Sequence, residues 1–224
     1  MYLHKISIDK ETLNRDRKIY QDAYLLHKKM WALVSRDKNQ QRDFLYRVEY
    51  DECQNIKYIY LLAPHQVSSQ NSIKIAVSPR YRPQLKTDER LHFKIRANPV
   101  IKRKENGKAK EYGLVMDAKH KFKKDGRSYQ EQLSLDELIH EVCIKWLVRK
   151  GEQHGFSVKQ FEVAIDNARE YLIRSPAKQE YMLRTQDFSG VLTVVDPELF
   201  IKALYKGIGS AKAFGCGLML VRRV

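Results

Sequence analysis

Residues 191–221 read VLTVVDPELFIKALYKGIGSAKAFGCGLMLV: an apolar run, a punctuated helix, a glycine-rich loop and a second apolar run. Asp196 is a typical N-cap, Pro197 fits the first helical position, and Gly207 fits the residue just past the helix end. Glu198 lies in the first turn, and the apolar residues of this helix are Leu199, Phe200, Ala203 and Leu204. The apolar runs at 191–195 and 218–221 predict strands. The stretch therefore predicts a strand–helix–strand unit at this end of the chain.

The glycine-rich loop within this stretch, residues 206–218 (KGIGSAKAFGCGL), contains four of the ten glycines of the chain. Such loops often bind phosphate, because glycine lets backbone N–H groups approach an anion closely. The loop leads from a helix into a strand and lacks the G-x-x-x-x-G-K-[ST] pattern, so it is neither a P-loop nor a dinucleotide-binding fingerprint. A helix cap and a tight turn would explain Gly207 and Gly209 but not Gly215 and Gly217. Phosphate binding and a purely structural turn are both open at this point.

The rest of the chain predicts two rounds of the same element order. Strands are expected at 2–8, 44–50, 58–63, 91–97, 161–165 and 171–174, with a short helix or loop and a Pro-broken edge strand within 64–85. Helices are expected at 18–34 and from the capping box Ser134-x-x-Glu137 to 149–151, whereas the basic segment 117–132 indicates an insertion or mobile loop. We therefore predict an α+β protein of two tandem ferredoxin-like (βαββαβ) domains with antiparallel sheets, residues 1–90 and 91–224.

The charge of the chain favours a polyanionic partner. It has 42 Lys and Arg against 27 Asp and Glu, a formal charge of +15. Between Lys94 and Arg127, twelve basic residues face four acidic ones, so about half of the surplus lies there. A solvated loop would explain such a run, and a membrane surface would attract it, but no basic amphipathic helix is evident. Nucleic acid is the better interpretation.

Compartment and metal content are predicted from what the sequence lacks. No apolar run approaches the length of a membrane helix, and residues 1–10 lack the apolar core of a signal peptide, so we expect a cytoplasmic protein without membrane contact. The three cysteines, Cys53, Cys143 and Cys216, have neither a C-x-x-C pattern nor zinc-ligand spacing to a histidine. We predict no disulfide and no metal.

The first helix carries a histidine that could perform acid–base chemistry. On a helical wheel, His27 lies at the edge of the apolar stripe in a band of aromatic rings that includes Tyr24, and Lys28 follows on the solvent side. A histidine in this position is commonly structural. With RNA as the ligand, however, the 2′-hydroxyl is an internal nucleophile, and cleavage needs proton transfer and charge stabilisation alone. His27 could supply the first, and Lys28 or Lys29 the second.

Motifs along the full length resemble the CasE family of CRISPR-associated endoribonucleases, the crRNA-processing subunit of type I-E Cascade. They are MYLHKI, YLLHKKMW, RLHFKIRANPVIKR, ELIHEVCIKWLVRKG, FSGVLTVVDPELF and KGIGSAKAFGCGLMLV. The resemblance implies two tandem ferredoxin-like domains, metal-independent cleavage of the CRISPR repeat stem-loop, and a 2′,3′-cyclic phosphate product that stays bound. It implies other Cascade subunits as partners and no cofactor.

The resemblance also assigns roles to individual residues. His27 would be the general acid or base, an alternative the sequence leaves open, and Tyr24 would orient or stabilise. In this family the glycine-rich loop lies near the RNA backbone. The residues expected to bind RNA are Lys94, Arg96, Asn98, Lys102, Arg103, Lys104, Lys110, Gly207, Gly209, Lys212, Gly215 and Gly217. Asn98, before Pro99, could instead cap a strand end. Two other functions stay open: a non-cleaving RNA-binding subunit, and a small-molecule enzyme of the same fold.

Overall fold

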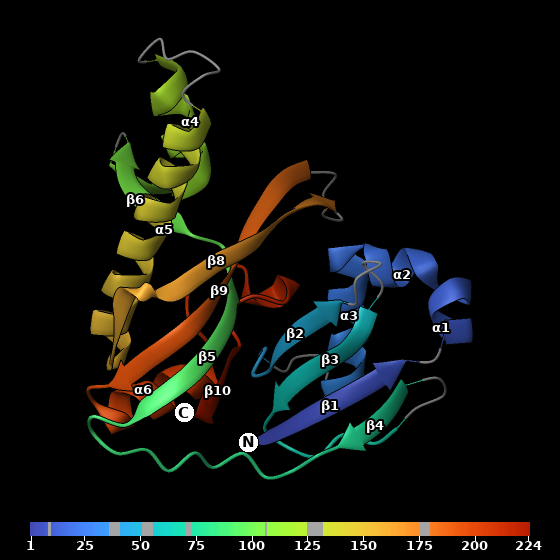
Figure 1. Cartoon of the computed structure of the whole chain (residues 1–224). Coiled ribbons are helices and arrows are strands. Elements are labelled where there is room, and N and C mark those ends of the chain that lie inside the picture. The colour runs from blue at the N-terminus through green and yellow to red at the C-terminus, as the bar shows by residue number, and fades with distance from the viewer. Residues whose placement is uncertain are drawn as a thin grey trace.

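The computed structural model describes residues 1–8, 10–35, 41–50, 56–69, 73–105, 107–124, 132–174 and 180–224. It is an α+β protein with two four-stranded antiparallel sheets that lie side by side, and a separate two-stranded hairpin. Figure 1 shows one sheet formed by the N-terminal part of the chain and the other by the C-terminal part, joined by an extended segment. No helix in the described residues is long and apolar enough to cross a membrane.

The first sheet has the order β2-β3-β1-β4. Its strands are β1 (Tyr2–Ile8), β2 (Leu45–Tyr50), β3 (Ile56–Ala63) and β4 (Ile73–Val77). Three helices lie against one face of this sheet: α1 (Lys10–Arg15), α2 (Arg17–Gln21) and α3 (Ala23–Val34). Ile6, Met30 and Ile59 are fully buried between the two layers, which anchors α3 on the sheet. The expected edge strand is confirmed as β4.

The expected helix over 18–34 is two helices. The chain breaks at Asp22, whose Oδ1 accepts hydrogen bonds from the N–H groups of Tyr24 and Leu25 at 2.8 and 3.0 Å. Asp22 is therefore the N-cap of α3, in an extended conformation. The prediction of one helix was wrong because the apolar spacing continues across the break.

The second sheet has the order β10-β5-β9-β8. Its strands are β5 (Arg90–Ala97), β8 (Phe156–Arg174), β9 (Glu180–Val194) and β10 (Met219–Arg223), and its helices are α5 (Gln132–His154) and α6 (Pro197–Lys206). Ile95, Leu147, Phe188 and Phe200 are fully buried in the core that these elements share. Asp196 Oδ1 accepts from Leu199 N at 3.0 Å, and Gly207 ends α6 with a φ of 75°, so both predicted helix boundaries are confirmed.

The two short strands expected at 161–165 and 171–174 are one long strand, β8. Its pairing with β9 is interrupted between Val158 and Val163 and again between Asp166 and Arg169. Each irregularity shifts the alternation of side chains between the two faces of the sheet. The alternation of apolar and polar residues is therefore interrupted although the strand itself is continuous.

Helix α5 is longer than predicted at both ends. It already includes Ser134, so the proposed capping box lies inside the helix, and it continues through Gly151 to His154. A Cβ atom at Gly151 would lie 2.4 Å from the backbone oxygen of Phe156. This glycine permits close approach of β8 instead of ending the helix.

Between β5 and α5 the chain forms an inserted unit: the hairpin β6 (Val100–Glu105) and β7 (Lys108–Gly113), then helix α4 (Leu114–Lys124). Part of the segment expected to be an insertion or mobile loop is therefore helical, with Ala118 buried. Leu114 and Val115 pack against the C-terminal core. The packed residues of this basic helix, Leu114, Val115 and Ala118, all lie near its N-terminal end. Such a short apolar stripe does not produce a helical periodicity that can be recognised in the sequence.

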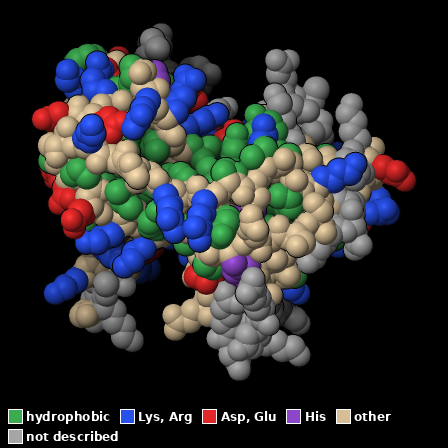
Figure 2. Space-filling model, turned by 90° about the horizontal axis from the view of Figure 1, so that it is seen from below, with side chains coloured by type: hydrophobic (Ala, Val, Ile, Leu, Met, Phe, Trp, Pro, Cys, Tyr) green, Lys and Arg blue, Asp and Glu red, His purple; other side chains and the backbone are tan. Residues whose placement is uncertain are grey.

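The positive charge is unevenly distributed over the surface. Figure 2 views the end of the molecule where both termini lie; apolar side chains run along the middle, and Lys and Arg side chains gather mainly on the side of the second sheet. Arg222 and Arg223, next to the C-terminus, are two exposed basic residues of the second sheet and its end.

Candidate functional site

His27 lies on α3 inside a group of aromatic rings. Its imidazole centroid is 6.0 Å from the ring of Trp31, 6.2 Å from Phe44 and 6.1 Å from Phe214. The side chain is half-buried, and its Nδ1 is enclosed without a hydrogen-bond partner among the described residues. The ring is thus held in place by its neighbours while part of it faces solvent. It does not lie in a dry core.

Arg42 lies close enough to His27 for its charge to act on the imidazole. Burial is the main cause that lowers the pKa of His27, and the positive charge of Arg42 lowers it further. The Arg42 guanidinium is itself half-buried and donates to the backbone oxygen of Phe44 at 3.0 Å. Both causes favour the neutral form of His27, which is the form that can accept a proton. The sequence analysis missed Arg42, which follows no motif and precedes β2 by three positions.

The glycine-rich loop supplies the opposite wall of this site. Phe214 ends the 3-10 turn η2 (Lys212–Phe214) and contacts His27 from the C-terminal part of the chain. The turn is held against the first sheet by the hydroxyl of Tyr46, which donates to the backbone oxygen of Ala213 at 2.9 Å. Lys212 has a lowered pKa, owing first to burial and then to the charge of Arg42. The charge of Arg42 thus acts both on His27 of α3 and on Lys212 of the glycine-rich loop.

The loop glycines act mainly through backbone shape. Gly207 N–H donates to Ala203 O at 2.8 Å, and Gly217 N–H donates to Arg96 O at 2.8 Å, so neither N–H points to a phosphate. Both residues are buried with positive φ, 75° and 86°. This corrects the expectation that these two glycines present N–H groups to an anion. Gly215 is also buried and packs beside Tyr46, whereas Gly209 is partly exposed.

The other proposed catalytic residues lie on the same helix as His27. Tyr24 is half-buried one turn before His27, on the same side of α3. Lys28 is exposed, and its position next to His27 in sequence turns it about 100° around the helix. The Lys29 ammonium lies 5.6 Å from the ring centroid of Tyr20. The cation whose charge acts on His27 is Arg42, which the sequence analysis did not name.

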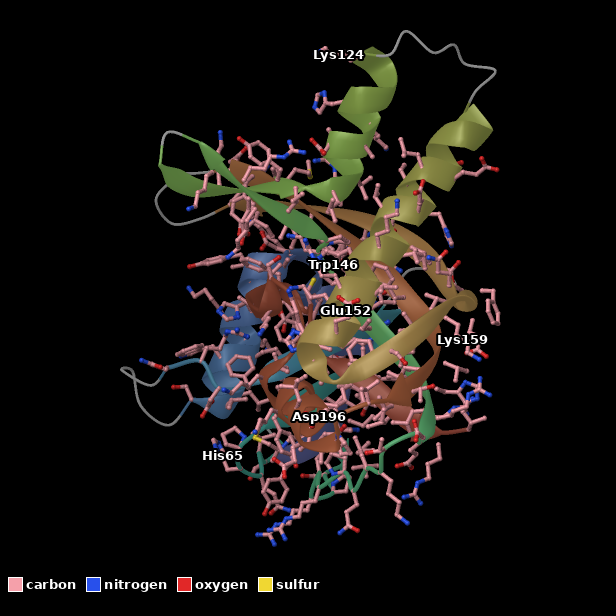
Figure 3. The ribbon with its side chains drawn as sticks, turned by 90° about the vertical axis from the view of Figure 1, so that its left-hand side faces the viewer. His65, Lys124, Trp146, Glu152, Lys159 and Asp196 are labelled. Carbon is pink, nitrogen blue, oxygen red and sulfur yellow. The ribbon has the colours of Figure 1, made fainter. Side chains whose placement is uncertain are left out.

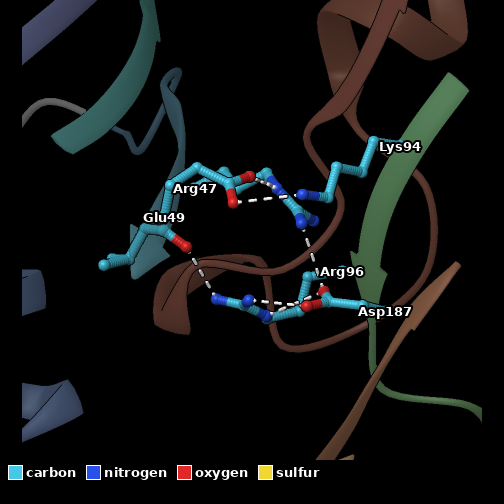
Figure 4. Close-up of polar contacts among 6 residues, drawn as sticks. Arg47, Glu49, Lys94, Arg96 and Asp187 are labelled. Atoms are coloured by element: carbon cyan, nitrogen blue, oxygen red, sulfur yellow. Dashed lines mark hydrogen bonds and ion pairs between the residues drawn. The ribbon is translucent and has the colours of Figure 1, made fainter. Parts of the chain in front are cut away.

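Arg96 is not on an exposed basic face, and this prediction was wrong. It is 3% exposed, and its Nε and Nη2 donate to the two carboxylate oxygens of Asp187 at 3.0 and 2.8 Å. Its Nη1 donates to Val48 O of β2 at 2.9 Å (Figure 4). Burial opposes the charge, but the hydrogen bonds and charge of Asp187 raise the pKa of Arg96. With its guanidinium engaged in this way, Arg96 joins the two sheets.

Lys94 belongs to the same polar network. Its ammonium lies 3.3 Å from Glu49 Oε2, and Glu49 also accepts from the fully buried Arg47 (Figure 4). Arg47 Nη2 in turn lies 3.3 Å from Asp187. Burial alone would raise the pKa of Glu49, yet Arg47 and Lys94 hold it below its usual range. Lys94 remains half-exposed, so it both connects the two sheets and is accessible from solvent.

Asn98 ties β5 to the glycine-rich loop. Its Nδ2 donates to Ser210 Oγ at 3.3 Å, and the Ser210 hydroxyl donates to Asn98 O at 3.3 Å. The two residues therefore hold each other, and the side chain serves the loop rather than capping the strand.

The proposed RNA-binding residues of the β6–β7 hairpin divide between its two faces. Arg103 and Lys110 are cross-strand partners, whereas Lys102 is paired with Glu111 on the other face, which Lys104 shares. Arg103 donates to both carboxylate oxygens of Asp117 at 2.8 and 2.7 Å, and Lys110 lies over the ring of Tyr112. Lys102 and Lys104 are exposed. The hairpin thus carries positive charge on both faces, beyond the edge of the second sheet (Figure 1).

Comparison with known proteins places this site in a family. Residues 1–223 match the family model described as CRISPR associated protein, so the chain belongs to that family. It is 28% identical over 219 residues to the CRISPR system Cascade subunit CasE of Escherichia coli K12, covering 98% of both chains. It is 28% identical over 150 residues to the CRISPR-associated endoribonuclease Cse3 of Thermus thermophilus, covering 63% of this chain and 59% of that protein. The resemblance expected from the sequence is confirmed.

Solved structures share the fold. Cse3 bound to a 19-nucleotide RNA superposes with a TM-score of 0.73 at 22% identity, covering 99% of this chain and 100% of that chain. Cas6e from E. coli superposes with a TM-score of 0.67 at 24% identity over the whole of both chains. At these identities the likeness establishes the α+β architecture with antiparallel sheets.

Proposed function

We propose that this protein is a metal-independent endoribonuclease that binds and cleaves the CRISPR repeat stem-loop of precursor crRNA. The 2′-hydroxyl oxygen next to the scissile phosphate attacks phosphorus, and the bond from phosphorus to the 5′-oxygen breaks. His27 takes the proton of the 2′-hydroxyl, and the departing 5′-oxygen takes a proton from water. The products are a 2′,3′-cyclic phosphate and a 5′-hydroxyl, and the protein stays bound to the mature crRNA.

One observation carries this proposal: a half-exposed imidazole, held among aromatic rings, lies within reach of the charge of Arg42. A general base must be in its neutral form to accept a proton, and burial and the charge of Arg42 both favour that form of His27. In this proposal Arg42 offsets the charge that develops on the phosphate oxygens, and Lys212, whose pKa the charge of Arg42 also lowers, binds the neighbouring backbone. The relatives support the reaction class, because the Thermus protein is named a CRISPR-associated endoribonuclease and the E. coli protein a Cascade subunit. We therefore propose Cascade subunits as partners.

The finer architecture that we propose is two tandem ferredoxin-like domains, 1–90 and 91–224. We number the strands of each four-stranded sheet in chain order, leaving out the hairpin β6–β7. Both sheets then have the order fourth, first, third, second. The second half has the complete βαββαβ order, with β6, β7 and α4 inserted after its first strand. The first half differs, because the described residues between β3 and β4, 64–69, contain no helix.

RNA binding is proposed for the exposed cations. Lys94, Lys102, Lys104, Lys110 and Lys212 can contact phosphates, each contributing salt-dependent affinity without selecting sequence. Asn98, Gly207, Gly209, Gly215 and Gly217 support this surface by fixing the glycine-rich loop. Arg96 and Arg103 engage carboxylates within the protein, so we assign them to the scaffold of the binding surface.

The test is incubation of a CRISPR repeat hairpin with the protein in EDTA. We expect cleavage to a cyclic phosphate, no cleavage when the cut nucleotide is 2′-deoxy, and no cleavage by His27→Ala despite hairpin affinity within a few fold of wild type. Bound but intact RNA in the wild-type reaction would instead identify a non-cleaving RNA-binding subunit. Cleavage of the deoxy substrate would exclude internal attack.

A further inference from the structure

A basic cleft lies on the far side of the glycine-rich loop from His27. It has a volume of about 490 Å³ and is bounded by β6 and β7, the C-terminal half of α5 and the loop. Figure 3 looks onto this side, where Trp146 marks the part of α5 that borders the cleft. Its charged and titratable lining residues are Lys102, Glu111, Arg149, Lys150, His154 and Lys212. Four permanent cations therefore face one carboxylate among the described residues that line it.

Among the described residues, most of this charge has no counter-ion. Glu111 lies 3.4 Å from Lys102. The partners of the other two lysines are neutral: Lys150 Nζ donates to Gln153 Oε1 at 2.9 Å, and Lys212 Nζ donates to Lys206 O at 2.8 Å. Burial, followed by the charges of their basic neighbours, lowers the pKa of both ammonium groups. The same causes lower the pKa of His154. An anion in the cleft would relieve this repulsion.

The cleft and His27 share one wall. Lys212 and Phe214 belong to the same short turn, with Phe214 against the ring of His27 and Lys212 lining the cleft. An RNA strand whose reactive phosphate lies at His27 therefore meets the cleft as soon as it crosses the glycine-rich loop.

We propose that this cleft binds the sugar–phosphate backbone of single-stranded RNA that flanks the cleavage site. This inference rests on the proposed function, and it adds Arg149, Lys150 and His154 to the binding surface. The cleft is the size of a small-ligand pocket, which admits a single strand but not a duplex. Trp146 is the one Trp, Tyr or Phe among the described lining residues and is 2% exposed, so its indole offers no face for a base to stack on. Recognition is thus through phosphates and independent of sequence.

The experiment compares two hairpins, one ending at the base of the stem and one extended by a single-stranded flank through and beyond the cut site. The extended hairpin carries a 2′-deoxy nucleotide at the cut site, so that it stays intact. The variant is Arg149→Gln with Lys150→Gln, and the matched control is Arg80→Gln with Arg82→Gln, two exposed arginines outside the cleft and the His27 site. We expect the cleft variant to bind the flanked hairpin roughly tenfold more weakly and the bare hairpin as wild type does. Its salt slope for the flanked hairpin should fall by about 0.7 for each lost phosphate contact.

The outcomes separate this inference from the proposed function. Equal losses on both hairpins would assign the cleft to the stem, and no loss on either would show that it binds no RNA; each result overturns the inference. An equal loss of affinity in the control variant would show that the effect comes from net charge alone, and this too would overturn the inference. Wild-type protein that neither binds nor cleaves the repeat hairpin would instead refute the proposed function.

Discussion

The neighbours of His27 hold its imidazole in place and still leave part of the ring exposed to solvent. Three aromatic rings fix the imidazole, and the enclosed Nδ1 leaves the solvent-facing part of the ring for chemistry. Burial and the charge of Arg42 act in the same direction, since both disfavour the imidazolium. As a base, His27 is therefore active above a pKa that lies below its ordinary value of about 6.5.

The role of Arg42 can be tested by the pH dependence of cleavage. In single-turnover reactions, the rate should rise with pH through the lowered pKa of His27 and then level off. Arg42→Gln removes a positive charge, so the pKa of His27 should rise and the acidic limb should move to higher pH. The plateau rate should also fall, because a cation near the phosphate is lost.

Arg82→Gln serves as the control, because Arg82 is an exposed arginine in the segment between β4 and β5. It should leave both the limb and the plateau unchanged. An acidic limb that stays in place in Arg42→Gln would show that the charge of Arg42 does not act on the reacting base.

At the scale of elements, the glycine-rich loop is a rigid support. Gly217 has a φ of 86°, and an added Cβ would lie 2.9 Å from the backbone oxygen of Ile208. We expect Gly217→Ala to reduce the free energy of unfolding by about 1–3 kcal/mol, in line with strained backbone conformations. Gly113→Ala is the matched control, because a Cβ there meets no atom within 4 Å. Urea denaturation monitored by tryptophan fluorescence measures both, and equal losses would refute the strain argument.

Elements bounded by capping residues could be predicted from the sequence, whereas elements shaped by tertiary contacts could not. Asp196, Pro197 and Gly207 define α6 by capping chemistry that acts within a few residues. The bulges of β8 and the passage of α5 through Gly151 depend on neighbouring strands, which the sequence does not display. The same distinction holds for α4, whose short apolar end has its partners in α5 and the second core.

The candidate site was predictable where a motif carried it. The glycine content singled out the loop, the helical wheel singled out His27, and the resemblance assigned their roles; the structure places Phe214 of the loop against His27. Arg42 was missed because its effect depends on a fold contact. Arg96 was misassigned because strand alternation gives its face but not the buried carboxylate of Asp187 opposite it.

At the scale of the whole molecule, a buried polar network joins the two sheets. Asp187 of β9 accepts from Arg96 of β5 and lies 3.3 Å from Arg47 of β2, so one carboxylate links both halves of the chain. This junction connects the first sheet, against which the helix of His27 packs, to the second sheet, whose strand β10 follows the glycine-rich loop. The geometry of the site therefore depends on the contact between the halves.

Loss of the Asp187 charge should cost far more than loss of a surface charge. Asp187→Asn leaves two buried guanidinium groups without their shared anion, and we expect the free energy of unfolding to fall by about 3–5 kcal/mol. Glu180→Gln is the control, because its ion pair with Arg174 is exposed and should contribute less than about 1 kcal/mol. Combining Asp187→Asn with Arg96→Met should recover part of the loss, since the second change removes one of the stranded charges. Urea midpoints at constant m-value measure all three proteins, and a double variant less stable than Asp187→Asn alone would show that Arg96 stabilises the junction without the carboxylate.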